Sequence, residues 1–128
     1  GWRRPVALQP PYSLLKPDIE EDILPLCQQE GIGVLPYQVL QGGLLTGKYR
    51  RDQAVPADSR QVEKPEWTLE LTDEVFDRLE QIEAEAGEQG RSLMQHSLLA
   101  LLEQPPVVSL VVGAKRIDQL GNLIAAVE

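Results

Sequence analysis

The sequence has one cysteine, few aromatic residues and no long apolar run. Because Cys27 is the only cysteine, an intramolecular disulfide and a cysteine-rich zinc site are both excluded, and we predict no metal site. A single cysteine favours a reducing compartment. No apolar stretch is long enough to span a bilayer, and residues 1–5 lack the apolar core of a signal peptide. We therefore expect a cytoplasmic protein that has no membrane partner.

Positive charge is also scarce, since the formal net charge is -8 at pH 7. A general nucleic-acid surface needs a net basic face to neutralise phosphates, so we expect no nucleic-acid partner, while a local basic patch stays compatible with the sequence. The chain starts at Gly1 and its sole methionine is Met94. We expect a processed product, a cloned segment or a fragment of a longer protein.

The length and composition favour one globular domain over residues 1–128. Apolar residues make up 42% and charged residues 25%, which is typical of soluble globular proteins. A chain of this size buries roughly two-thirds of the surface of its unfolded state. A compact core is therefore expected.

Apolar segments and helix signals alternate along the chain. Three apolar segments predict strands, and four periodic segments predict helices. The predicted strands are residues 6–8, 32–37 and 107–112, and the predicted helices are residues 18–30, 72–87 (or to Gly90), 92–104 and 116–127. Such alternation is typical of an α/β fold with a parallel sheet and right-handed crossovers.

Local signals define several helix ends. Asp18 with Glu21 is a capping-box pattern, as is Ser92 with Gln95. Thr72 is expected to cap the second helix. Pro25 lies within the first helical pattern, so either the first turn is separate or the helix kinks there. Residues 50–68 have almost no periodicity and predict a long surface loop, which at this length is either functional or disordered.

The second strand leads into a glycine-rich loop that contains Gly42, Gly43 and Gly47 beside Lys48. Glycines let backbone N–H groups approach an anion closely, and a lysine supplies the opposite charge. The loop is therefore a candidate phosphate site. The alternative is a flexible turn after a strand, because a glycine-rich loop is a weak motif without its context.

A second candidate anion site follows the third strand, where Gly113, Lys115 and Arg116 precede a helix. The amino terminus of a helix with two cations beside it favours an anion. The alternative is a solvated basic cap. Ligands of parallel α/β sheets lie at the carboxyl ends of strands, so Gln9 and Tyr37 are candidate residues on the same grounds.

Four segments together resemble the carboxy-terminal half of an aldo-keto reductase. They are QPPYSLL from Gln9, LPY ending at Tyr37, LQGGLLTGKY from Leu40 and VGAKRIDQ ending at Gln119. The resemblance covers nearly the whole chain. It implies a partial (half) TIM-type (β/α) barrel, with about three parallel strands and four helices present here.

The resemblance also implies a site for NADP(H). Gln9 would face the nicotinamide carboxamide, and Tyr37 would stack on the nicotinamide ring. Gln38 stands where the family often has serine. The remaining contacts are implied for the pyrophosphate (Leu40, Gly43, Leu45, Gly47 and Lys48), for the adenosine 2′-phosphate (Gly113, Lys115 and Gln119) and, with a one-residue shift, for the adenine (Asn122).

No catalytic residue is predicted in this chain. The family's Asp, Tyr, Lys and His set, in which tyrosine is the general acid, belongs to the first half of the barrel. His96, Tyr12 and Tyr49 are interpreted as packing residues, and Cys27 as a small apolar core residue. We expect an NADP-binding half of a carbonyl reductase that is inactive alone. The alternative is a non-catalytic nucleotide-binding or self-associating half-barrel module, and the expected partner is a second copy or a complementary half-barrel.

Overall fold

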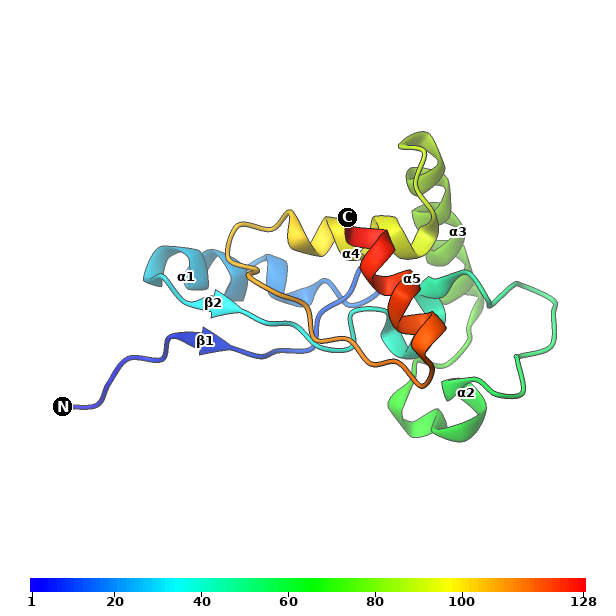
Figure 1. Ribbon diagram of the computed structural model, residues 1–128, viewed down its shortest axis with the longest axis horizontal. Helices are drawn as coiled ribbons and strands as arrows, with labels where there is room; N and C mark the ends of the chain where they lie inside the picture. Colours follow the sequence, from blue (N-terminus) through cyan, green and yellow to red (C-terminus); the bar gives the residue numbers. More distant parts are fainter.

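The computed structural model describes residues 1–128, and short strands and helices alternate along it (Figure 1). The elements in chain order are β1 (Ala7–Leu8), η1 (Asp18–Glu20), α1 (Ile23–Glu30), β2 (Gly33–Val34), η2 (Gln41–Thr46), α2 (Arg60–Glu63), η3 (Pro65–Trp67), α3 (Asp73–Glu88), α4 (Leu93–Leu102) and α5 (Ile117–Val127). Those labelled η are 3-10 helices. None of the helices is both long and apolar enough to cross a membrane.

The sheet is parallel, as the alternating pattern predicts. Ala7 lies opposite Gly33 and Leu8 opposite Val34. Val34 also forms a parallel bridge with Val107, so the segment after α4 pairs with β2. The three predicted strand segments therefore lie side by side, with β2 between the other two.

The prediction of a continuous third strand over residues 107–112 is wrong, because the pairing is regular only at Val107. Val34 donates its N–H to the Pro106 carbonyl at 2.8 Å and accepts from Val108 N at 3.0 Å. Pro36 has no N–H with which to continue this ladder, and its carbonyl accepts from Val111 N at 2.8 Å. The proline thus interrupts the ladder, and the fold is α/β with a two-stranded sheet instead of three regular strands.

The first predicted helix divides into η1 and α1, so its first turn is separate. The predicted capping box at Asp18 is wrong, since Asp22 is the N-cap and its Oδ1 accepts from Ile23 N at 2.6 Å. Pro25 falls in the first turn of α1, where its missing N–H would have no intrahelical acceptor. The helix ends at Gly31, whose φ of 66° is left-handed.

Three other helices begin where the sequence predicts. Thr72 caps α3 by accepting from Val75 N at 3.3 Å, and Ser92 caps α4 by accepting from Gln95 N at 3.1 Å. Helix α4 ends at Leu102, before the predicted proline stop, and α5 starts after Arg116. These three helix starts are confirmed. Each could be predicted because it depends on residues only a few positions apart in the sequence.

Helix α4 joins two apolar clusters. Leu98 and Leu101 pack in a cluster with the sheet, α1 and α5, whereas Leu93 packs with η2 and α3. Leu98 and Leu101 are at most 1% exposed, as expected for a nearly apolar helix. In Figure 1, α3 and α5 both lie beside α4. The glycine-rich loop, which forms η2, also contacts α4.

Candidate functional site

The glycine-rich loop forms η2, and its backbone is held in left-handed conformations. Gly42, Gly43 and Gly47 have φ of 65°, 98° and 88°. A Cβ at Gly42 would lie 2.7 Å from Thr68 Cγ2, so only glycine fits there without displacing the chain. Gln41 fixes the loop from inside, because its Oε1 accepts a buried hydrogen bond from Ser13 Oγ at 2.9 Å. The loop is therefore packed against the body of the protein through Gln41 and Gly42.

The loop borders a cavity of about 990 Å³ that also reaches the segment before α5. Most of the residues that the sequence singles out for cofactor binding line this one cavity, although they come from two separate parts of the chain, residues 37–48 and 113–122. They are Tyr37, Gln38, Leu40, Gly43, Lys48, Gly113, Lys115, Gln119 and Asn122. The fold therefore brings nine of the twelve predicted positions together.

Gln9, Leu45 and Gly47 do not line the cavity. Leu45 is 0% exposed and packs in the cluster of α3 and η2, so its side chain faces the core. Gly47 is the left-handed residue that ends η2. Gln9 is exposed at the end of the first strand segment.

Four cavity residues lie in the segment that the sequence predicts as a surface loop. Asp58, Arg60, Glu63 and Trp67 belong to α2, η3 and the turn before them. The length of this aperiodic segment was the only signal of a functional role. Nothing in the local sequence indicates which of its side chains face the cavity, because that depends on contacts with residues 42 and 115.

The cavity is positively charged although the chain is acidic. Its lining contains four cations and two carboxylates, a net charge of +2, whereas the whole chain carries -8. The cations are Lys48, Arg60, Lys115 and Arg116, and the carboxylates are Asp58 and Glu63. This local reversal of charge favours an anionic ligand.

The two cations before α5 are paired with carboxylates. Lys115 Nζ contacts Glu63 Oε2, and Arg116 Nε donates to Asp118 Oδ1 at 3.0 Å. This hydrogen bond and the negative charge of Asp118 raise the pKa of Arg116. The same hydrogen bond and the positive charge of Arg116 lower the pKa of Asp118. The backbone N–H of Lys115 donates to Gln119 Oε1 at 2.8 Å. An anion entering here would compete with these internal partners.

The residues interpreted as packing residues are buried. Tyr12 is 1% exposed, Tyr49 5%, Cys27 3% and His96 7%. Tyr12 donates a hydrogen bond from its hydroxyl to Glu20 Oε1. Burial is the largest cause of the raised pKa of Tyr12, and this hydrogen bond is the next. None of the four lines the cavity, and no cluster of His, Cys, Asp or Glu side chains has the arrangement of a metal site.

A family model described as the aldo/keto reductase family matches residues 1–128, the whole chain. This chain belongs to the aldo/keto reductase family. L-glyceraldehyde 3-phosphate reductase from Escherichia coli K12 is 31% identical over 132 residues, which cover 98% of this chain and 38% of that relative. The NADH-specific methylglyoxal reductase of the same strain is 34% identical, with 93% of this chain and 36% of the relative covered.

The fold points to the same family. A glycerol dehydrogenase structure from Gluconobacter oxydans matches 95% of this aldo/keto reductase chain with a TM-score of 0.73 and 31% identity, but only 37% of its own chain is covered. The chain thus spans well under half the length of these relatives, and its fold corresponds to part of a TIM-type barrel.

The cavity suits a nicotinamide dinucleotide in size and chemistry. Its volume is at the upper end of the range for ligand pockets, about 300 to 1,000 Å³. The Tyr37 side chain borders it and is 38% exposed, so an aromatic face is available for a flat ring. Two lysines of the lining, Lys48 and Lys115, suit phosphate groups.

Proposed function

We propose that this chain is the cofactor-binding part of an NADP-dependent carbonyl reductase. The observation that carries the proposal is the convergence of nine cofactor-type residues on one cationic cavity of about 990 Å³. A bound NADPH would supply a hydride to a carbonyl carbon. Membership of the aldo/keto reductase family supports oxidoreductase chemistry for the whole protein.

In this proposal the chain's own residues bind and orient the nucleotide. Tyr37 supports the nicotinamide ring with Gln38 beside it, Lys48 and the Gly43 backbone face the pyrophosphate, and Lys115 faces the 2′-phosphate. The cavity has a further polar wall in Gln119 and Asn122, which suits an adenosine. We also propose a cytoplasmic setting, which the single buried thiol of Cys27 supports.

The chain is proposed to be inactive alone. Reduction of a carbonyl needs a proton donor at the carbonyl oxygen. Tyr37 is the one tyrosine in the cavity lining, and its proposed role is stacking. Tyr12 and Tyr49 lie in the core, and His96 lies outside the lining.

The test is a calorimetric titration with NADPH and NADH, followed by an aldehyde-reduction assay on the same sample. We expect NADPH to bind more tightly than NADH, and Lys115→Ala to narrow that gap by about 1 to 3 kcal/mol, the contribution of a charge-assisted hydrogen bond. We expect no turnover. Equal affinities would contradict the assigned 2′-phosphate site, and turnover above a boiled control that is lost in Tyr37→Ala would contradict the proposed inactivity.

A further inference from the structure

The wall of the cavity formed by residues 58–67, here called the strap, is attached firmly at its ends. Ser59 is fully buried, and Gln61 Nε2 donates to the Leu69 carbonyl at 2.9 Å. Thr68, just beyond the strap, lies so close to Gly42 that no Cβ fits between them. The strap therefore starts and ends on the body of the protein.

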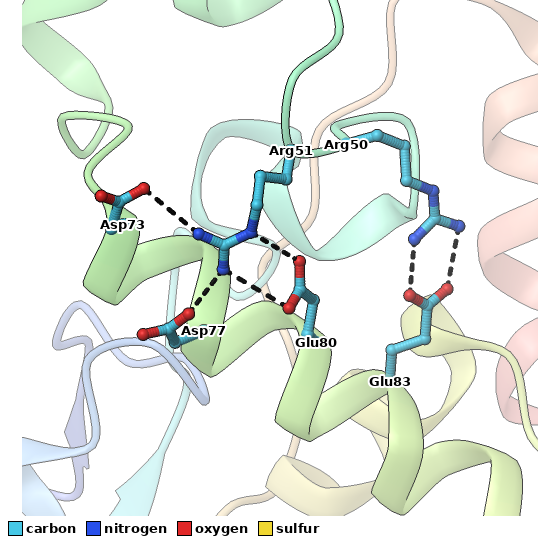
Figure 2. Close-up of polar contacts among 6 residues, drawn as sticks. All are labelled: Arg50, Arg51, Asp73, Asp77, Glu80 and Glu83. Atoms are coloured by element: carbon cyan, nitrogen blue, oxygen red, sulfur yellow. Dashed lines mark hydrogen bonds and ion pairs between the residues drawn. The ribbon is translucent and has the colours of Figure 1, made fainter.

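The chain before the strap is tied down as well. Arg51 donates to Asp73 at 3.2 Å, Asp77 at 2.5 Å and Glu80 at 3.0 Å, and Arg50 forms a double hydrogen bond with Glu83 (Figure 2). All four carboxylates belong to α3. The chain before the strap is thus attached to α3.

Across the cavity the strap is held by one ion pair. Glu63 Oε2 contacts Lys115 Nζ, two residues that are 52 positions apart and both line the cavity. No backbone hydrogen bond joins the strap to residues 111–116. The side chains of Lys115 and Glu63 are 50% and 44% exposed, so water reaches the pair and it can open.

We propose that Glu63 is a specificity-determining residue that closes the strap on Lys115 and weakens the preference for NADPH. This inference depends on the proposed function, which assigns Lys115 to the 2′-phosphate. A 2′-phosphate competes with the carboxylate of Glu63 for the ammonium group and is repelled by the negative charge of that carboxylate. NADH has a 2′-hydroxyl instead, which can donate to the carboxylate while the ion pair stays intact.

The charges around the pair agree with this arrangement. Asp58, the other carboxylate of the strap that lines the cavity, lies near enough to Arg116 to contribute to its raised pKa, after the larger effect of Asp118. Two acids of the strap thus face two cations of the opposite wall. Glu66 belongs to the same strap but does not line the cavity, and it provides a matched control.

The experiment compares the unmodified chain with Glu63→Gln, Lys115→Met, the double variant and Glu66→Gln. Titration calorimetry measures the Kd of NADPH and NADH for each protein. Glu63→Gln is expected to tighten NADPH binding about twofold to fivefold, since an exposed charge contact has an effect of this order, and to change NADH binding less than twofold. The gain should be smaller in the Lys115→Met background, because the competition for the ammonium group is absent there, and Glu66→Gln should change neither affinity.

Weaker NADPH binding by Glu63→Gln, or an equal gain with Glu66→Gln, would overturn the specificity role. A second measurement needs no nucleotide. Amide hydrogen exchange of residues 60–64 should be faster in Glu63→Gln than in Glu66→Gln, because the strap has lost its contact across the cavity. If the unmodified chain bound neither nucleotide, the proposed function would fail, and unchanged exchange would separately overturn closure of the strap by Glu63.

Discussion

Gly42 is the residue of the glycine-rich loop at which a side chain would disturb the packing most clearly. Its φ of 65° is left-handed, and the place of a Cβ is taken by the methyl group of Thr68. Gly31 has nearly the same φ, 66°, but nothing lies within 4 Å of its Cβ position. A side chain at Gly31 would therefore introduce backbone strain alone, whereas a side chain at Gly42 would add steric overlap.

We expect Gly42→Ala to destabilise the protein more than Gly31→Ala. A left-handed alanine costs roughly 1 to 2 kcal/mol at either position. At Gly42, overlap with Thr68 at 2.7 Å adds an overpacking cost of about 1 to 3 kcal/mol. Urea unfolding of both variants measures the difference. Equal losses would mean that Thr68 moves away from the loop at little cost.

At this scale the sequence predicts site residues whose motifs are local. Tyr37, Lys48, Lys115 and Gln119 each lie in a short quoted segment, and all four line the cavity. Leu45 lies in the same kind of segment but points into the core, since side-chain direction depends on packing against α3. Glu63 belongs to no motif, and its role depends on a contact across 52 positions.

At the scale of elements, α3 is the support to which the chain after the cavity loop is attached. Arg50 and Arg51 contact four carboxylates along one side of this helix (Figure 2). The hydrogen bond from Arg50 and its positive charge lower the pKa of Glu83, against the opposing effect of burial. Folding therefore favours the ionised form of Glu83.

Because the pKa of Glu83 is lowered, the stabilisation that its contact with Arg50 provides depends on pH. The stabilisation is fully present above the unfolded value of 4.5 and is lost as pH falls through the lower folded value. We expect Arg50→Met to lower stability by about 0.5 kcal/mol at pH 7, as for an exposed pair, and by less below pH 4.5. Thermal unfolding between pH 3 and 7, with Arg3→Met as the control, measures this. A loss that is independent of pH would contradict the account.

Elements are predicted well where their signals are local and poorly where they are not. Thr72 and Ser92 cap their helices as predicted, because each cap depends on residues within one turn. The regular strand expected after Val107 fails because Pro36, on a different segment, cannot donate to it. Helices α2 and η3 have no periodic signal and are short, so their packing on the cavity loop determines them.

At the scale of the whole molecule, much apolar surface lies in water. Val6 is 83% exposed, Val108 64% and Ile117 89%. Strands of this composition are usually covered on both faces. The chain spans under 40% of the length of the relatives compared above, and its own residues leave this apolar surface exposed.

We expect the chain to associate with a second copy or with a complementary half-barrel. Exposed apolar patches and open sheet edges promote association, and a stable interface should bury on the order of 1,000 Å² or more. Light scattering at micromolar concentration should show a dimer or a larger species. A clean monomer with one cooperative thermal transition would mean that these residues are stable in water without a partner.

The central claim is that the cavity between the glycine-rich loop and the start of α5 holds a nicotinamide nucleotide. The most direct measurement is amide hydrogen exchange with and without saturating NADPH. The account predicts added protection in residues 37–48, 58–67 and 112–119, and little change in α1 or α3. No protection at saturation, or protection confined to elements away from the cavity, would contradict it.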